Sequence, residues 1–210
     1  MELKFAKSVW QRCMASSSAS GRVTLEPTEV SKMLRERLKA EFPGTKFSVR
    51  MKNYSIRIGW LDKPYTELVN LIADAYSFSD FDGMIDMEYS INRWLLPDGR
   101  LVGTVTTGTT GSAGSMPACH TKQPDPLAVR VGSLIKYVFC EHGWSEEYEA
   151  SLAKEVCKKW GIDYNPDIAV SDHPIPRSLR GNGIWRLTNL MFRHEREMGE
   201  KATRERRCGC

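Results

Sequence analysis

Two short segments of the chain contain the side chains best suited to metal chemistry. Cys119 and His120 are adjacent, and Cys140 precedes His142 by two positions. Thiolates and imidazoles in sets of four are typical ligands of zinc, so the two segments form a candidate zinc site if they meet in space. Neither spacing matches a recurring zinc module, and the sequence motifs of a zinc deaminase are absent. We predict no metal and no cofactor, with a zinc site at these four residues as the alternative.

Other catalytic motifs are also absent from the sequence. His194-Glu195 lacks the second His of a metalloprotease helix. Gly114-Ser115 is followed by Met116-Pro117, so the Lys that a phosphate-binding loop requires is missing. A nucleophile pair of Cys140 and His142 is the one enzymatic arrangement left to consider. We therefore predict no catalytic residues and a non-enzymatic protein, with an unrecognised active site as the alternative.

Basic residues are concentrated in the first part of the chain. Residues 1–60 contain 12 Lys and Arg against 5 Asp and Glu, although the net charge of the whole chain is only +4. Apolar and polar side chains alternate on both sides of Lys52-Asn53, which is typical of a half-buried hairpin. The polar face of this hairpin contains Arg50, Lys52 and Arg57. Such a surface permits contact with the phosphates of a nucleic acid.

A second basic segment lies near the end of the chain. It contains Arg177, Arg180 and Arg186, with Trp185 beside the last of these. Arginine side chains and backbone N–H groups can bind phosphate while Trp stacks on a base, so this segment is a second candidate nucleic-acid contact. In the alternative interpretation, Trp185 and the apolar residues after it pack a terminal helix onto the core.

Hydrophobic periodicity and turn residues predict the elements that position these side chains. We expect helices over residues 3–14, 27–42, 65–76, 146–160 and 189–207, hairpins over 47–58 and 89–106, a strand over 129–140, and a solvated acidic loop over 80–88. The Pro97-Asp98-Gly99 sequence is a typical turn for the second hairpin. The expected fold is α+β, with a small antiparallel sheet of two hairpins and a further strand covered by helices, and a helical C-terminal part.

Composition suggests three segments. Residues 1–22 form an N-terminal helix and a Ser-rich linker, residues 23–165 the α+β domain with a mobile loop near 106–118, and residues 166–210 an irregular segment and the C-terminal helix. An N-terminal helix on a flexible linker is also typical of an interaction arm. A docking scaffold, or a homodimer formed through this helix, is therefore an alternative.

Cysteine usage and hydropathy indicate the compartment. The six cysteines form no Cys-x-x-Cys pair, which favours reduced thiols. Cys208 and Cys210 are expected to be free thiols in a frayed tail, with cross-linking or metal binding as the alternative. No apolar run is long enough to span a membrane or to act as a signal peptide, so we expect no membrane partner and a location in the cytoplasm of a host cell.

One stretch also resembles a known family. Lys46-Phe47-Ser48-Val49-Arg50 is preceded by Glu41-Phe42-Pro43-Gly44 and followed by Trp60, a helix and Phe81-Asp82-Gly83-Met84-Ile85-Asp86. Over about residues 25–100 this pattern is similar to the large polyvalent protein-associated domains of phages, plasmids and integrative elements. The resemblance implies a protein that travels with mobile DNA and helps it to survive in, or act upon, a new host. It supplies no catalytic residues.

These observations together predict a function. We expect an accessory protein of a phage or mobile element that acts as a non-enzymatic counter-defence inhibitor, of the anti-CRISPR or anti-restriction type. Its expected partner is nucleic acid or a host defence nucleoprotein complex, bound through the basic surface.

Overall fold

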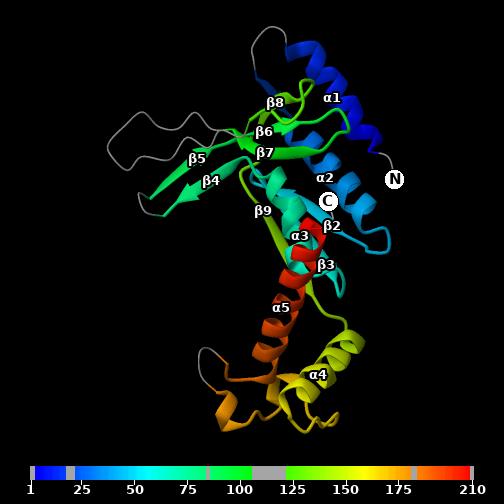
Figure 1. Cartoon of the computed structure of the whole chain (residues 1–210), viewed down its shortest axis with the longest axis vertical. Helices are drawn as coiled ribbons and strands as arrows, with labels where there is room; N and C mark the ends of the chain where they lie inside the picture. The colour runs from blue at the N-terminus through cyan, green and yellow to red at the C-terminus, as the bar shows by residue number, and fades with distance from the viewer. Residues whose placement is uncertain (1–2, 18–21, 84–85, 106–121, 181–183, 209–210) are drawn as a thin grey trace. The chain divides into compact units, whose positions relative to one another are not determined.

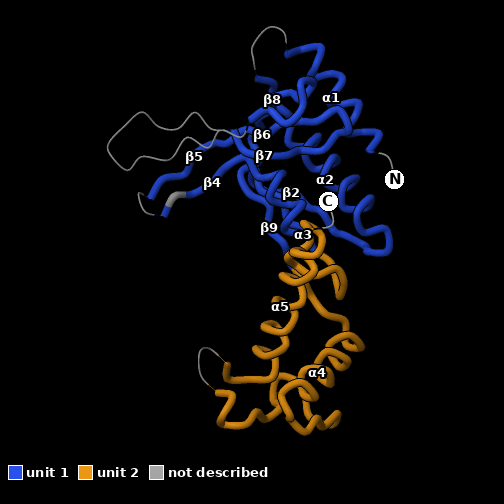
Figure 2. Tube along the Cα trace, viewed as in Figure 1, with its two compact units in different colours: residues 1–59, 70–141 blue, residues 60–69, 142–210 orange. Residues whose placement is uncertain are grey.

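A computed structural model of the chain describes residues 3–17, 22–83, 86–105, 122–180 and 184–208 (Figure 1). The chain divides into two compact units, residues 1–59 with 70–141 and residues 60–69 with 142–210 (Figure 2). Helices and small sheets are both present, and the C-terminal part is helical, so the predicted α+β class is confirmed. The predicted segment boundaries near residues 22 and 165 stay predictions, and the expected loop near 106–118 lies outside the described residues.

Unit 1 begins with two helices, α1 (Lys4–Ser17) and α2 (Pro27–Glu41), both as predicted. Pro27 occupies the first helical position, where its missing N–H costs nothing. The Glu26 backbone N–H donates to Glu29 Oε2 at 3.0 Å and so finds a partner at the helix start. The predicted inward stripe is buried completely at its centre, at Val30, Met33, Leu34 and Leu38.

The N-terminal helix packs against its own unit. Glu36 of α2 accepts hydrogen bonds from the backbone N–H groups of Phe5, at 3.0 Å, and Ala6, at 2.9 Å. Because the first N–H groups of a helix have no partner within it, Glu36 caps α1 from a neighbouring element. Arg12 also pairs with Glu29 at 2.8 Å. The apolar stripe of α1 is buried at Ala6, Val9 and Cys13, and the docking scaffold or homodimer through this helix stays a prediction.

A four-stranded sheet forms one part of the unit 1 core, in the order β1-β8-β6-β7. Its strands are β1 (Val23–Leu25), β6 (Asn92–Leu95), β7 (Leu101–Val105) and β8 (Val129–Ser133). β1 runs parallel to β8, and β6 runs antiparallel to both β7 and β8. The predicted turn joins β6 to β7, with Gly99 at φ +87° and its N–H bonded to Leu96 O.

The predicted hairpin belongs to a three-stranded sheet of β2 (Ser48–Lys52), β3 (Ser55–Leu61) and β9 (Val138–Gly143), in the order β2-β3-β9. Asn53 and Tyr54 form the turn between β2 and β3, with φ values of +50° and +60°. Two left-handed residues in succession define a type I′ turn, whose twist matches that of the flanking strands. Tyr54 is therefore a turn residue and not the first inward residue of a strand.

Two predictions about strands are wrong. The acidic segment is not a loop, because β4 (Ser79–Asp82) pairs antiparallel with β5 (Met87–Ser90) and the second hairpin begins only at β6. The predicted strand over 129–140 is two strands, β8 and β9. Between them the chain leaves one sheet for another: Ser133 Oγ bonds to Leu25 O, whereas the Lys136 N–H bonds to Tyr54 O. A single hydrophobic pattern cannot reveal such a change of partner.

The predicted helix over 65–76 is α3 (Thr66–Ala73) followed by a turn of 3-10 helix, η1 (Asp74–Tyr76). Unit 2 contains α4 (Glu146–Trp160), capped by Ser145 and ended by Gly161 at φ +64°, as predicted. Two 3-10 helices, η2 (Val170–Asp172) and η3 (Arg177–Leu179), lead to the long helix α5 (Leu187–Cys208). α4 and α5 enclose a core that includes Leu152, Val156, Leu187, Leu190 and Met191. Among the helices described, none has the length and apolarity needed to cross a membrane.

Candidate nucleic-acid interface

The structure brings the three predicted basic residues of the hairpin onto one face. Arg50 on β2 lies directly opposite Arg57 on β3, and Lys52 is two positions further along β2. Paired residues and residues two apart share a face of a sheet, so the three side chains point the same way. All three are exposed. The alternate positions face the interior, where Val49 is 8% exposed and Ile56 is fully buried.

Two features hold this face in place. The type I′ turn fixes the register in which Arg50 meets Arg57. On β2, the carbonyl of Val49 accepts a hydrogen bond of 2.7 Å from Arg35 of α2, which ties the helix to the strand. The basic residues therefore stand on a rigid hairpin, as precise ligand contacts require.

β9 adds aromatic side chains to the same face. The Arg57 guanidinium lies 5.8 Å from the ring centroid of Phe139 and forms an ion pair with Glu141. The rings of Tyr137 and Phe139 are 6.1 Å apart, and Phe139 is 46% exposed. We call Arg50, Lys52, Arg57, Tyr137 and Phe139 the basic sheet face. It combines cations that can bind phosphate with a ring that can stack on a base.

Sequence reasoning missed the aromatic part of this face. Tyr137 and Phe139 were grouped with the apolar residues of a single strand over 129–140. The sequence does contain a signal for it. Glu141 is two positions after Phe139 and so shares its side of the strand, and a carboxylate is expected to face solvent.

The three cations of the basic sheet face differ in how freely they can bind a phosphate. Arg57 shares its charge with Glu141, so its net pull on a phosphate is reduced. Arg50 and Lys52 form no ion pair with any residue that the structure describes. These two cations are the strongest candidate phosphate ligands of the hairpin.

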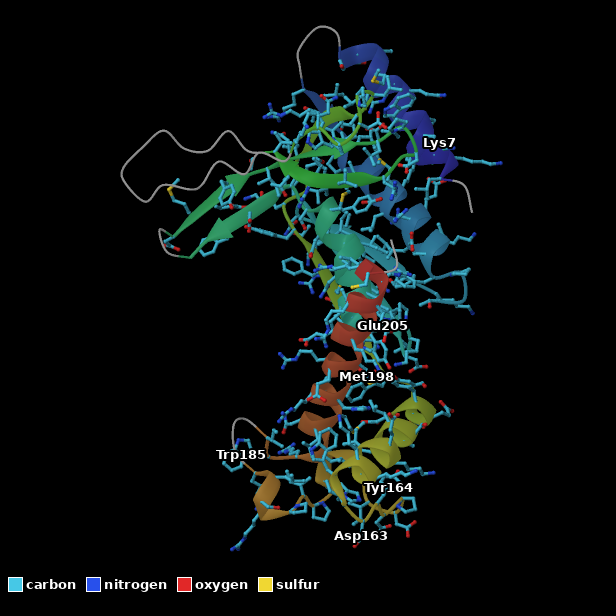
Figure 3. The ribbon with its side chains drawn as sticks, in the orientation of Figure 1. Lys7, Asp163, Tyr164, Trp185, Met198 and Glu205 are labelled. Carbon is cyan, nitrogen blue, oxygen red and sulfur yellow. The ribbon has the colours of Figure 1, made fainter. Side chains whose placement is uncertain are left out.

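The second predicted basic segment lies in unit 2. Figure 3 labels Trp185 in the segment that leads into α5, and this Trp is 67% exposed. The backbone N–H groups of Trp185 and Arg186 donate to Asn189 Oδ1, which fixes the start of α5. Arg177 lies in η3 and Arg180 directly after it, whereas residues 181–183 lie outside the described part of the chain. As the alternative interpretation expects, Leu187, Leu190 and Met191 are buried in the core of unit 2, whereas Trp185 itself is exposed.

Arg180 of this set lines a cavity. The cavity, of about 390 Å³, is bounded by Trp160, Ser178, Leu179, Arg180, Ile184, Leu190 and Arg193. A larger hollow of about 510 Å³ shares Ile184 and Arg193 with it and adds Arg196. Arg193 forms an ion pair with Glu197 at 3.2 Å. The two basic sets belong to different units, and each is a separate candidate contact.

The proposed cysteine and histidine chemistry finds little support. Cys119 and His120 lie outside the described residues, so the four-residue zinc hypothesis stays a prediction. Within the described ranges, no group of three or more His, Cys, Asp or Glu side chains is placed to hold a metal ion. Burial, with a smaller contribution from Asp74, raises the pKa of Cys140 to about 12. A thiol with such a pKa is a poor nucleophile at neutral pH.

His142 belongs to a buried polar cluster of unit 2 that sequence reasoning did not find. Glu195 of α5 is 6% exposed and accepts hydrogen bonds from Trp144 Nε1, at 2.8 Å, and Tyr148 OH, at 2.7 Å. His142 Nδ1 lies 3.6 Å from the same carboxylate, and its ring stacks on Trp60 at 5.1 Å between centroids. Both oxygens of Glu195 are occupied by protein donors, and its burial leaves them out of reach of solvent. The cluster therefore joins α4 to α5 and is not placed to act on a substrate.

Comparison with known proteins identifies a family. The sequence profile of large polyvalent protein associated domain 29 matches residues 25–143, which is more than half of the chain. Comparison with curated proteins and with solved structures finds no match. The matched region contains β2 to β9, α2 and α3, and all of the basic sheet face. The resemblance predicted from the sequence is confirmed, and the chain belongs to the large polyvalent protein associated domain 29 family, which associates it with phages and mobile elements.

Proposed function

We propose that the protein is an accessory protein of a phage or mobile element that binds nucleic acid through the basic sheet face, either free or within a host defence nucleoprotein complex. The observation that carries this proposal is the placement of Arg50, Lys52 and Arg57 together on the exposed face of a rigid hairpin. By occupying nucleic acid that a host defence complex needs, the protein would act as a counter-defence inhibitor of the anti-CRISPR or anti-restriction type.

Electrostatics support a polyanionic partner. Two adjacent arginines across a strand pair repel each other, and like charges directly opposite destabilise a sheet. A phosphate chain placed over Arg50 and Arg57 would relieve that repulsion and release condensed counterions at the same time. The ion pair of Arg57 with Glu141 offsets part of this repulsion in the free protein, and a bound phosphate would offset more of it.

A salt titration tests the proposal. Binding of fluorescently labelled DNA and RNA oligonucleotides is measured by anisotropy between 50 and 200 mM salt for the wild type and for a variant with Arg50→Ala, Lys52→Ala and Arg57→Ala. Three lost cations should weaken binding by at least about 10-fold and reduce the slope of log K against log salt by about 2.

The matched control removes three exposed cations elsewhere, with Lys39→Ala, Lys158→Ala and Lys201→Ala. Both variants have the same net charge, so only a local contact distinguishes them. Equal losses in the two variants, or binding by the wild type that does not respond to salt, would contradict the proposed interface.

Capture from a host extract tests the counter-defence part. The protein is purified from a defence-competent host with and without nuclease treatment, and phage plaquing is scored in the same host. Wild type should retain a nucleoprotein complex in a nuclease-sensitive manner and restore plaquing, and the three-residue variant should do neither. Capture that persists after nuclease treatment and in the variant would indicate a protein target bound through another surface.

A further inference from the structure

We infer that the basic sheet face selects single-stranded nucleic acid, with an unpaired base stacked on Phe139. This inference rests on the proposed function and specifies the form of its ligand. It starts from the exposure of Phe139, the second residue of β9, which leaves 46% of a large apolar side chain in water. Single exposed apolar side chains are common on protein surfaces, and the feature that distinguishes Phe139 is the Arg57 guanidinium 5.8 Å from its ring centroid.

The three strands place cations and ring in one row. Arg50 on β2 is paired with Arg57 on β3, and the Arg57 guanidinium lies 5.8 Å from the ring centroid of Phe139 on β9. The strand order is β2-β3-β9 (Figure 1), so the row crosses the sheet from two cations to an aromatic ring. Neighbouring strands lie about 4.8 Å apart, so the row is about as long as a short stretch of nucleotide backbone. Phosphates at Arg50 and Arg57 would leave the adjoining base over Phe139.

Tyr137 supports the ring without covering it. Its ring is tilted by 42° to that of Phe139 at 6.1 Å between centroids, so the two rings are not stacked face to face. This contact restricts the motion of Phe139, while its exposed surface stays available. A ring that is already ordered loses little entropy when a base stacks on it.

Stacking on Phe139 favours the unpaired form of the ligand over the duplex. In a duplex both faces of each base are covered by neighbouring base pairs, and only edges and phosphates reach the surface. An aromatic ring on a sheet can therefore contribute to binding only when the base is unpaired, as in other sheet surfaces that stack bases. Every base has a π face, so we expect little sequence preference.

Substitution at Phe139 tests this inference. Phe139→Ala should weaken binding of a single-stranded 15-mer by about 5- to 100-fold and change binding of the corresponding duplex by less than about 2-fold. Phe139→Trp should preserve single-strand binding, and its indole fluorescence should be quenched when the base stacks. The 15-mer is tested as DNA and as RNA, since stacking alone does not distinguish the two.

The control is Phe81→Ala, which removes a ring of similar exposure, 52%, from β4 of the same unit. It should leave both affinities unchanged, and circular dichroism verifies that all variants are folded. If Phe139→Ala weakens single-strand and duplex binding equally, or weakens neither of them, the stacking inference is wrong. In that case a salt-dependent loss of binding in the Arg50, Lys52 and Arg57 variant would still support the proposed function. If the wild type binds no nucleic acid at 50 mM salt, the proposed function fails and the inference fails with it.

Discussion

At the scale of the residue, Gly99 shows how closely α1 is packed. A Cβ added at Gly99 would lie 2.5 Å from Ala6 Cβ, and the residue has φ +87°. Gly99→Ala combines backbone strain with a steric clash, so we expect it to lower the free energy of unfolding by about 3 kcal/mol. Denaturant unfolding measures this loss.

Substitutions at two other glycines distinguish the effect of backbone strain from that of the steric clash. Gly44 has neither a neighbour within 4 Å nor a positive φ, and Gly161 has φ +64° but no neighbour within 4 Å. Alanine should be nearly neutral at Gly44 and should cost about 1 kcal/mol at Gly161. Equal effects at all three positions would show that Gly99 is not held against α1.

Tyr148 predicts a loss of stability in alkali. Burial, followed by the hydrogen bond to Glu195, raises the pKa of Tyr148 above its usual value of about 10. The folded form then keeps a proton that the unfolded form releases, so stability is full below about pH 10 and falls as the pH rises further. Tyr148→Phe should reduce this alkaline loss in thermal unfolding measured from pH 8 to 11.

The same substitution has a cost at neutral pH. Without the hydroxyl donor, one oxygen of the buried Glu195 carboxylate loses its partner, and we expect a loss of about 1–3 kcal/mol at pH 7. Tyr54→Phe, at an exposed hairpin turn, controls for removal of a hydroxyl. If Tyr148→Phe loses stability in alkali as the wild type does, the loss is not caused by ionisation of Tyr148.

The sequence allowed part of the candidate site to be predicted at this scale. Arg50, Lys52 and Arg57 were identifiable because a two-residue period is a local property of a hairpin. Phe139 and Glu195 were not, because each acquires its role from another segment. Phe139 depends on Arg57, which is distant in the sequence, and Glu195 depends on Trp144 and Tyr148 of α4.

At the scale of the element, α1 depends on a cap supplied by α2. Glu36 accepts the N–H groups of Phe5 and Ala6, so Glu36→Ala leaves two donors at the start of α1 without their partner. We expect a loss of about 1–2 kcal/mol and faster hydrogen exchange in the first turn of α1. Lys39→Ala, on the exposed side of α2, should affect neither. Unaltered exchange in α1 of the Glu36 variant would argue against the cap.

Helices were predicted more completely than strands. Pro27, Ser145 and Gly161 are local signals of helix ends, and each lies where the structure places that end. β1 was missed because three residues are too few to show a period, and it exists only through its pairing with β8. The strand over 129–140 was divided for the same reason, since its two halves pair with different sheets.

At the scale of the whole molecule, the cysteines report on the stability of each unit. Cys13 of unit 1 and Cys157 of unit 2 are buried, and burial raises the pKa of both thiols. Cys208, at the end of α5, is exposed. Alkylation followed by peptide mapping should label Cys208 within minutes under native conditions and should label Cys13 and Cys157 only as denaturant unfolds their units.

A Cys208→Ser variant controls for reagent access to the tail, because it should lose the fast reaction and nothing else. Rapid native labelling of Cys13 would show that α1 opens without global unfolding and would contradict its close packing on α2. The denaturant concentrations at which Cys13 and Cys157 become reactive measure the stabilities of units 1 and 2 separately.

The parallel pairing of β1 with β8 has a consequence for biosynthesis. Ser133 Oγ donates to the carbonyl of Leu25, a contact between residues 108 positions apart. At about 5–20 residues per second, a ribosome needs roughly 5–20 s to deliver the second strand after the first has been made. During that interval Leu25, which is fully buried in the finished protein, has no partner strand. The nascent chain therefore cannot complete the four-stranded sheet until late in translation, and we expect it to bind ribosome-associated chaperones during that interval.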